Sequence, residues 1–135
     1  MSFVVDASVV VAWAFEEEHT IAEEALARIR SEEAAVPALW WYELRNVLML
    51  GERRGRLTER AMVRFLQDLS RLAITIDFPP DETQVLAFAR RQGLTLYDAA
   101  YLELAVRKAW PLATLDQELA SAAQAEGVSL ISQAT

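Results

Sequence analysis

Three aspartates stand at the ends of apolar segments, where burying a carboxylate is costly. Asp6 ends the short run FVVD, Asp98 opens the segment YDAAYLELA, and Asp116 follows PLATL. In open α/β sheets, ligands bind in the crevice beyond the carboxyl ends of the strands, and these positions are predicted to face it. Aspartate is also a favoured N-cap residue, so each of the three could instead begin a helix without any chemical role.

Glu43 stands inside a predicted helix rather than at its end. The apolar stripe of that helix follows spacings of three and four and comprises Trp40, Leu44, Val47 and Leu48. Glu43 lies three residues after Trp40 and four before Val47, so it belongs to the stripe. A cap cannot explain an acid at this place, and a buried salt bridge to an arginine is the structural alternative.

These four residues, which we call the acidic quartet, need a source of positive charge. Two carboxylates about 4 Å apart repel each other by about 4 kcal/mol at an effective dielectric constant of about 20. A fold that gathers four of them must protonate some or supply a cation. The chain has no cysteine and a single histidine, His19, so nitrogen and sulfur ligands are scarce. Oxygen ligands favour Mg²⁺ or Mn²⁺, and we predict that one or two such ions are bound by Asp6, Glu43, Asp98 and Asp116.

The composition is that of a soluble domain with a substantial core. The chain has 135 residues, of which 53% are hydrophobic. The absence of cysteine excludes disulfides, thiolate zinc sites and cysteine nucleophiles. The sequence shows no signal peptide, and no apolar run approaches the roughly 18 to 20 residues that span a bilayer. We therefore expect a cytoplasmic protein.

The formal net charge of −7 argues against non-specific attraction to nucleic acid. The acidic quartet supplies part of this charge, which one or two divalent ions would offset. Arginines nevertheless concentrate in the stretch ERRGRLTERAMVR, which contains Arg53, Arg54, Arg56, Arg60 and Arg64. The planar guanidinium group suits phosphate, but a bias towards arginine can equally reflect coding composition.

Short apolar strands alternate with helices along the chain. Strands are predicted at 3–6, 34–37, 73–77, 111–115 and 128–132. Helices are predicted at 8–18, at 20–32 with Thr20 as N-cap, at 38–55 ending at Gly51 or Gly55, at 58–72 with Thr58 as N-cap, at 82–93 with Gly93 as the stop, at 97–109 and at 116–127. The pattern predicts a single α/β domain over 1–135, with a mostly parallel central sheet of four to five short strands flanked by helices.

Four segments in order, VVDASVVVAW, WYELRNVL, LTLYDAAYLELA and LATLDQELASAA, resemble the PIN-domain ribonucleases. Among these the VapC-type toxins of VapBC toxin–antitoxin modules are the most similar, and the resemblance covers nearly the whole chain. It implies that the acidic quartet binds metal, with Asp116 holding a second ion or orienting the water. Ser8 and Thr114 match small hydroxyl positions that often line such a site, although a helix cap and a strand end explain each of them equally well.

The resemblance implies a metal-dependent endoribonuclease that hydrolyses RNA phosphodiester bonds to 5′-phosphate and 3′-hydroxyl ends. It also implies a homodimer and a VapB-like antitoxin, in a heterotetramer or larger complex, whose C-terminal segment covers the acidic pocket. An apolar groove or dimer face could be formed by Trp13, Phe15, Trp40, Trp41 and Tyr42, for which packing in the core is the alternative.

Other classes of protein fit the sequence less well. A phosphoacceptor receiver domain needs an acidic pair after its first strand and a late lysine, but Asp6 has no acidic neighbour and Lys108 lies inside a predicted helix. A haloacid-dehalogenase-like phosphatase needs Asp-x-Asp there, and residue 8 is serine. A PIN-like RNA-binding or scaffold module with weak or no catalysis remains the alternative.

Overall fold

The sheet consists of short strands that run in parallel. The computed structural model describes residues 2–132, and its strands are β1 (Ser2–Val5), β2 (Glu33–Pro37), β3 (Ile74–Asp77) and β4 (Leu112–Ala113). They pair in the order β3-β2-β1-β4. Phe3, Val4 and Val5 are fully buried, as expected for a central strand covered on both faces. The predicted α/β class and parallel sheet are thus confirmed.

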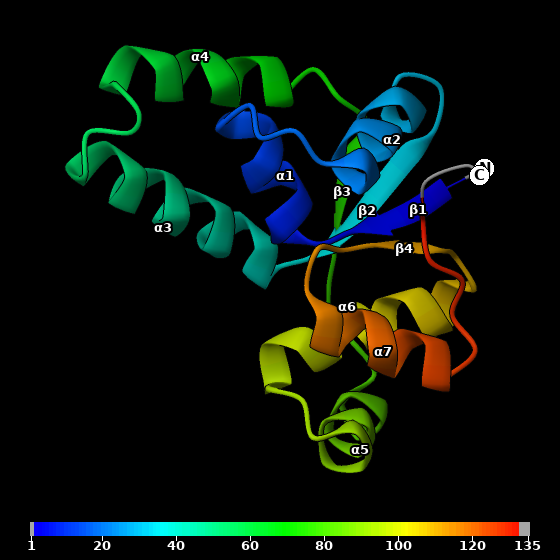
Figure 1. Ribbon diagram of the computed structural model, residues 1–135. Coiled ribbons are helices and arrows are strands. Elements are labelled where there is room, and N and C mark those ends of the chain that lie inside the picture. The colour runs from blue at the N-terminus through cyan, green and yellow to red at the C-terminus, as the bar shows by residue number, and fades with distance from the viewer. Residues whose placement is uncertain (1, 133–135) are drawn as a thin grey trace.

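The helices lie on the two sides of the sheet, as Figure 1 shows. On one side are α1 (Ala7–Ala14), α2 (Thr20–Ile29), α3 (Leu39–Arg53) and α4 (Glu59–Leu69). On the other are α5 (Glu82–Gln92), α6 (Leu96–Lys108) and α7 (Gln117–Ala125). In the part of the chain that is described, no helix is long and apolar enough to cross a membrane.

The strand order changes direction between β1 and β4. The chain adds β2 and β3 on one side of β1 and then returns to place β4 on the other side. Such a topological switch point opens a crevice beyond the carboxyl ends of the two strands. Asp6 follows β1 there, and its backbone N–H donates to the carbonyl of Ala113 at 2.9 Å. The fold therefore places Asp6 at the expected ligand-binding edge.

Capping and stop residues in the sequence predicted several of the helix ends correctly. Thr58 caps α4 by accepting from the N–H of Ala61 at 3.1 Å, and Gly93 ends α5 with a φ of 64°. The prediction that Thr20 caps the second helix is wrong. His19 takes this role, because its Nδ1 accepts from the N–H of Ile21 at 3.2 Å.

Three other sequence predictions differ from the structure. The first predicted helix ends at Ala14, and the last predicted strand is reduced to a single bridge between Leu112 and Leu130. Of the two glycines predicted to end α3, Gly51 lies inside the helix, whereas Gly55 directly follows the C-cap residue Arg54 with a φ of 74°. A Cβ atom at Gly51 would stand 2.6 Å from Cζ of Phe15, so this glycine allows the aromatic ring to pack directly against the helix.

Candidate active site

Asp6 is a buried carboxylate held by two hydroxyl groups. Its side chain is 6% exposed, and Oδ2 accepts hydrogen bonds from Ser8 at 2.8 Å and from Thr114 at 2.7 Å. Although Asp6 precedes α1, its side chain makes no capping hydrogen bond. The capping alternative is therefore wrong for this residue, and the structure places both predicted hydroxyl residues beside it.

The two hydroxyl groups also fix the loop that follows β4. Oγ of Ser8 accepts from the N–H of Leu115 at 3.0 Å, and Oγ1 of Thr114 accepts from the N–H of Asp116 at 3.0 Å. Because each oxygen accepts from a backbone amide, its own hydrogen is free to point at Asp6. The network connects the ends of β1 and β4 and orients the Asp6 carboxylate.

Glu43 reaches the same region from α3. It is half-buried, and its Oε1 accepts from the hydroxyl of Tyr101 at 2.7 Å. Within the described residues it makes no ion pair, so the alternative of a salt bridge to arginine is wrong. The sequence predicts for Tyr101 only a place on an apolar helix face. Its place on the same face as Asp98, three residues later, was the available signal.

The remaining two acids differ in their local roles. Thr95 caps α6 by accepting from the N–H of Asp98 at 3.1 Å, so Asp98 lies in the first turn and is not a cap. Asp116 does cap its helix: Oδ1 accepts from the N–H groups of Glu118 at 2.9 Å and Leu119 at 3.2 Å. The capping alternative is correct for Asp116, and it occupies only one of the two carboxylate oxygens.

The quartet is coupled electrostatically. Burial raises the pKa of Asp6, as does the charge of Asp116, while the two hydroxyl donors lower it. Burial likewise raises the pKa of Glu43, opposed by the Tyr101 hydrogen bond. The pKa of Asp98 rises to about 6, first through burial and then through the charges of the other three acids. The fold has thus brought Asp98 close enough to the other three carboxylates, all distant in the sequence, for their charges to act on it.

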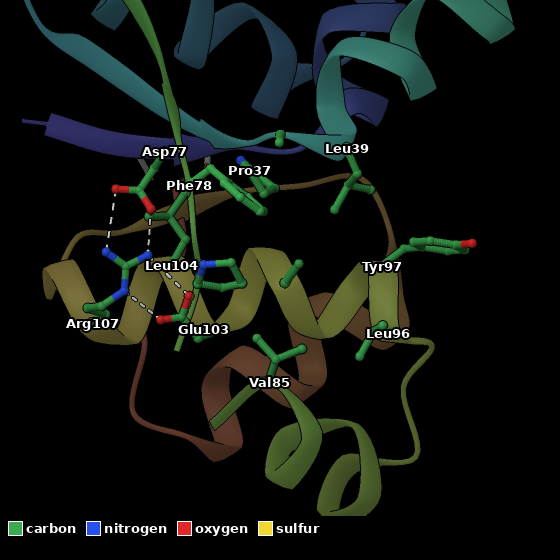
Figure 2. Close-up of a pocket in the computed structure, with 13 residues that line it drawn as sticks. Pro37, Leu39, Asp77, Phe78, Val85, Leu96, Tyr97, Glu103, Leu104 and Arg107 are labelled. Carbon is green, nitrogen blue, oxygen red and sulfur yellow. Dashed lines mark hydrogen bonds and ion pairs between the residues drawn. The ribbon is translucent and has the colours of Figure 1, made fainter. Parts of the chain in front are cut away.

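No basic side chain among residues 2–132 pairs with the quartet. A contrasting arrangement lies beneath the end of β3, where Arg107 bonds to Asp77 and to the buried Glu103, each at 2.6 Å (Figure 2). Those two acids border an apolar pocket of about 230 Å³, and their charge is already balanced. The acids of the quartet, by contrast, form no ion pair within the described residues.

The donor chemistry of the quartet fits a hard divalent cation. Its ligands are carboxylate oxygens, the set that Mg²⁺ and Mn²⁺ prefer. In the described part of the chain, no three acidic or histidine side chains form a ready-made metal cage. Mg²⁺ usually takes one or two carboxylates and keeps several waters, so it does not require such a cage. The quartet therefore matches a divalent cation in its charge and in the type of its ligand atoms.

The aromatic residues singled out in the sequence separate into two groups. Trp13 donates from Nε1 to the carbonyl of Ala22 at 2.8 Å, Phe15 packs on α3, and Trp40 is buried. These three belong to the core of the chain. Trp41 and Tyr42 are exposed and face outward from the start of α3.

The parallel sheet and its order of strands belong to a known family of α/β domains. A family model for the PIN domain matches residues 3–125, and the chain belongs to this family. It is 35% identical over 124 residues to Ribonuclease VapC3 of Pyrobaculum aerophilum, which covers 89% of this chain and 93% of that protein. Exonuclease VapC9 of the same organism is 39% identical over 89 residues, covering 65% of each chain.

Solved structures agree with this assignment. The crystal structure of PAE2754 from Pyrobaculum aerophilum has a TM-score of 0.72 and 29% identity, and the match covers 97% of this chain and 92% of that one. A toxin–antitoxin complex from Klebsiella pneumoniae has a TM-score of 0.66 at 18% identity, covering 98% and 99%. The similarity to the Klebsiella pneumoniae structure shows only that the two chains share a fold.

Proposed function

We propose that the protein is a metal-dependent endoribonuclease of the VapC type, which hydrolyses RNA phosphodiester bonds. One observation supports the proposal: Asp98 is close enough to Asp6, Glu43 and Asp116 for their charges to raise its pKa, and within residues 2–132 none of these four acids forms an ion pair. The similarity to a VapC ribonuclease supports RNA as the substrate.

Each member of the quartet has a role in this proposal. Asp6, Glu43 and Asp98 would hold the principal Mg²⁺ or Mn²⁺ ion, and Asp116 would hold a second ion or orient the attacking water. When bound, a divalent ion supplies Lewis-acid activation of water and offsets charge that develops on the leaving oxygen. No side chain needs to become covalently modified, which is consistent with the absence of cysteine.

Three further residues position the acids. Ser8 and Thr114 fix Asp6 through the two hydrogen bonds to Oδ2, and Tyr101 fixes Glu43. These donors lower the cost of keeping a buried carboxylate charged, because hydrogen bonds to the ionised form stabilise it. These hydrogen bonds therefore offset part of the effect of burial on the pKa values of Asp6 and Glu43 and orient both carboxylates.

Cleavage of circular single-stranded RNA tests the activity most sharply. A circle has no ends, so only an endonuclease opens it, whereas a linear substrate does not distinguish the proposed activity from that of an exonuclease such as the named relative. We expect the wild-type chain to open the circle with Mg²⁺ or Mn²⁺ and to leave it intact in excess EDTA. Asp6→Asn should fold normally and fail to cut. Undiminished cutting by that variant, or in EDTA, refutes the mechanism.

The partner proposed from the family is a VapB-like antitoxin. A segment carrying arginine or lysine suits an acidic pocket that lacks its own counter-charge. We propose a homodimer, combined with the antitoxin in a heterotetramer or larger complex. Expression of the chain without any partner should arrest growth, and expression of Asp6→Asn should not. Normal growth in the presence of demonstrably active enzyme contradicts the toxin role.

The alternative is an RNA-binding or scaffold module of the same fold with weak or no catalysis. It predicts RNA binding that Asp6→Asn leaves intact and no opening of circular RNA with either ion. The circle assay therefore decides between the two functions.

A further inference from the structure

An open hollow of about 720 Å³ adjoins the acidic quartet. It lies along the first half of α3, and Glu43 forms part of its wall. Across it stands Tyr97, the residue immediately before Asp98 in the first turn of α6. Glu43 therefore connects the hollow directly to the proposed site of cleavage, and Tyr97 connects it through its chain neighbour Asp98.

Aromatic rings dominate the exposed surface of this hollow. Tyr42 is 72% exposed and Tyr97 is 62% exposed, although each ring has a large apolar face. Trp41 makes an edge contact with Tyr42, with ring centroids 5.0 Å apart. Figure 2 shows Tyr97, which also lines the neighbouring apolar pocket, extending outward from the start of α6. Its ring is thus accessible to a planar ligand.

A guanidinium group, that of Arg45, also lines the hollow. Arg45 lies with Cζ 3.9 Å from the centroid of Trp41 and donates to the carbonyl of Trp41 at 3.1 Å. Among residues 2–132, no carboxylate pairs with Arg45, although Glu43 is two residues away and the chain carries a net charge of −7. An arginine that is stacked on a ring and free of acidic partners is well suited to phosphate.

We propose that this hollow, the stacking pocket, binds an unpaired nucleotide of the RNA next to the bond that is cut. The base stacks on the ring of Tyr42 or Tyr97, and Arg45 contacts a phosphate. Bases of an RNA duplex are stacked on each other and cannot enter, so the pocket selects single-stranded or looped RNA. This inference rests on the proposed nuclease function and adds residues that position the substrate beside the acids.

RNA binding to the cleavage-silent Asp6→Asn chain tests the stacking pocket. The probe is a short fluorescent single-stranded RNA of random sequence, measured by anisotropy in Mg²⁺, with an RNA duplex of equal length for comparison. Tyr42→Ala and Tyr97→Ala should weaken single-strand binding, at least one of them by about 5- to 150-fold, the range for loss of one stacked base. The corresponding Phe variants should bind as the parent does, and the duplex should bind weakly.

Two further variants complete the design. Phe78→Ala is the matched control, because Phe78 is 73% exposed but lines the other pocket, and it should leave binding unchanged. Arg45→Ala should weaken binding and reduce the slope of log K against log salt by about 0.7, the value for one single-strand phosphate.

Distinct results separate failure of the stacking pocket from failure of the proposed function. The pocket is wrong if both Ala variants bind RNA like the parent, or if the chain binds no single-stranded RNA. It is also wrong if the variants alter only the molecular mass in light scattering, which would make this surface an interface between chains. Aromatic-dependent binding by a wild-type chain that cuts no RNA would retain the pocket and refute the nuclease.

Discussion

Tyr101 on α6 donates its hydroxyl hydrogen to Oε1 of Glu43 on α3 over 2.7 Å. The two residues are 58 positions apart in the sequence, and the tyrosine is fully buried. Burial and the charges of Asp6 and Glu43 raise the pKa of Tyr101, so its hydroxyl remains a donor at every ordinary pH. The contact therefore fixes a carboxylate from one helix against the helix that carries Asp98.

Tyr101→Phe should weaken the metal site while preserving the fold. The ring stays in place, and loss of one hydrogen bond costs about 0.5–1.5 kcal/mol of stability. Without its donor, Glu43 can rotate, so we expect a several-fold loss of Mn²⁺ affinity in a titration followed by electron paramagnetic resonance. Tyr97→Phe, which removes an exposed hydroxyl, is the control. Equal Mn²⁺ affinity in wild type and Tyr101→Phe would show that the contact is only structural.

Thr114→Val should destabilise the protein more than the small change in side-chain size suggests. The substitution keeps the shape of the side chain but removes the donor to Asp6 and the acceptor for the N–H of Asp116. A buried carboxylate that loses a donor costs about 1–3 kcal/mol, measurable by urea unfolding. Thr114→Ser retains the hydroxyl and should recover most of that loss. A Ser variant as unstable as the Val variant would contradict the role of the hydroxyl.

Two substitutions separate the capping role of Asp116 from the effect of its charge. Asp116→Asn keeps an oxygen that can accept from Glu118 and Leu119, so its stability should match that of wild type, whereas Asp116→Ala should lose about 1 kcal/mol. Both variants remove the charge, and both should cleave circular RNA more slowly. Wild-type cleavage by Asp116→Asn would mean that this residue serves only as a cap.

The raised pKa of Asp98 predicts that divalent cations stabilise the protein more at neutral than at acid pH. Its pKa is about 6 in the fold and 3.8 in its ordinary state, so the native chain binds more protons than the unfolded chain between these values. Without a cation, the free energy of unfolding therefore falls as pH rises through this window. Mg²⁺ should raise Tm more above about pH 7 than below about pH 5, since protons and cations compete for the carboxylates. An equal or reversed effect in calorimetry would argue against cation binding here.

Much of the fold was predictable because its signals are local. Runs such as FVVD indicate buried strands by their apolar side chains alone, and a glycine such as Gly93 permits the left-handed φ that ends a helix. The final strand was over-predicted, since an apolar run does not reveal whether its backbone finds a partner. Leu130 finds only the bridge to Leu112 at the edge of the sheet.

Among the acids of the candidate site, Glu43 was predictable for the opposite reason: it stands where local rules disfavour an acid. Glu43 interrupts an apolar stripe, and no short-range role accounts for it. The groups that hold the acids could not be predicted, because these contacts cross the fold. Thr114 meets Asp6 over 108 positions, and Tyr101 resembles any other core residue of its helix until the position of Glu43 is known.

Direct measurement of cation binding tests the central claim. Mn²⁺ is titrated into the full chain and the free ion is followed by electron paramagnetic resonance, for wild type, Asp6→Asn and Asp77→Asn. Asp77 is the matched control, because its carboxylate already pairs with Arg107. Saturation of wild type and Asp77→Asn by one or two ions, with most of that binding lost in Asp6→Asn, is the predicted result. Equal binding by Asp6→Asn and wild type, or no binding by wild type, would contradict the account.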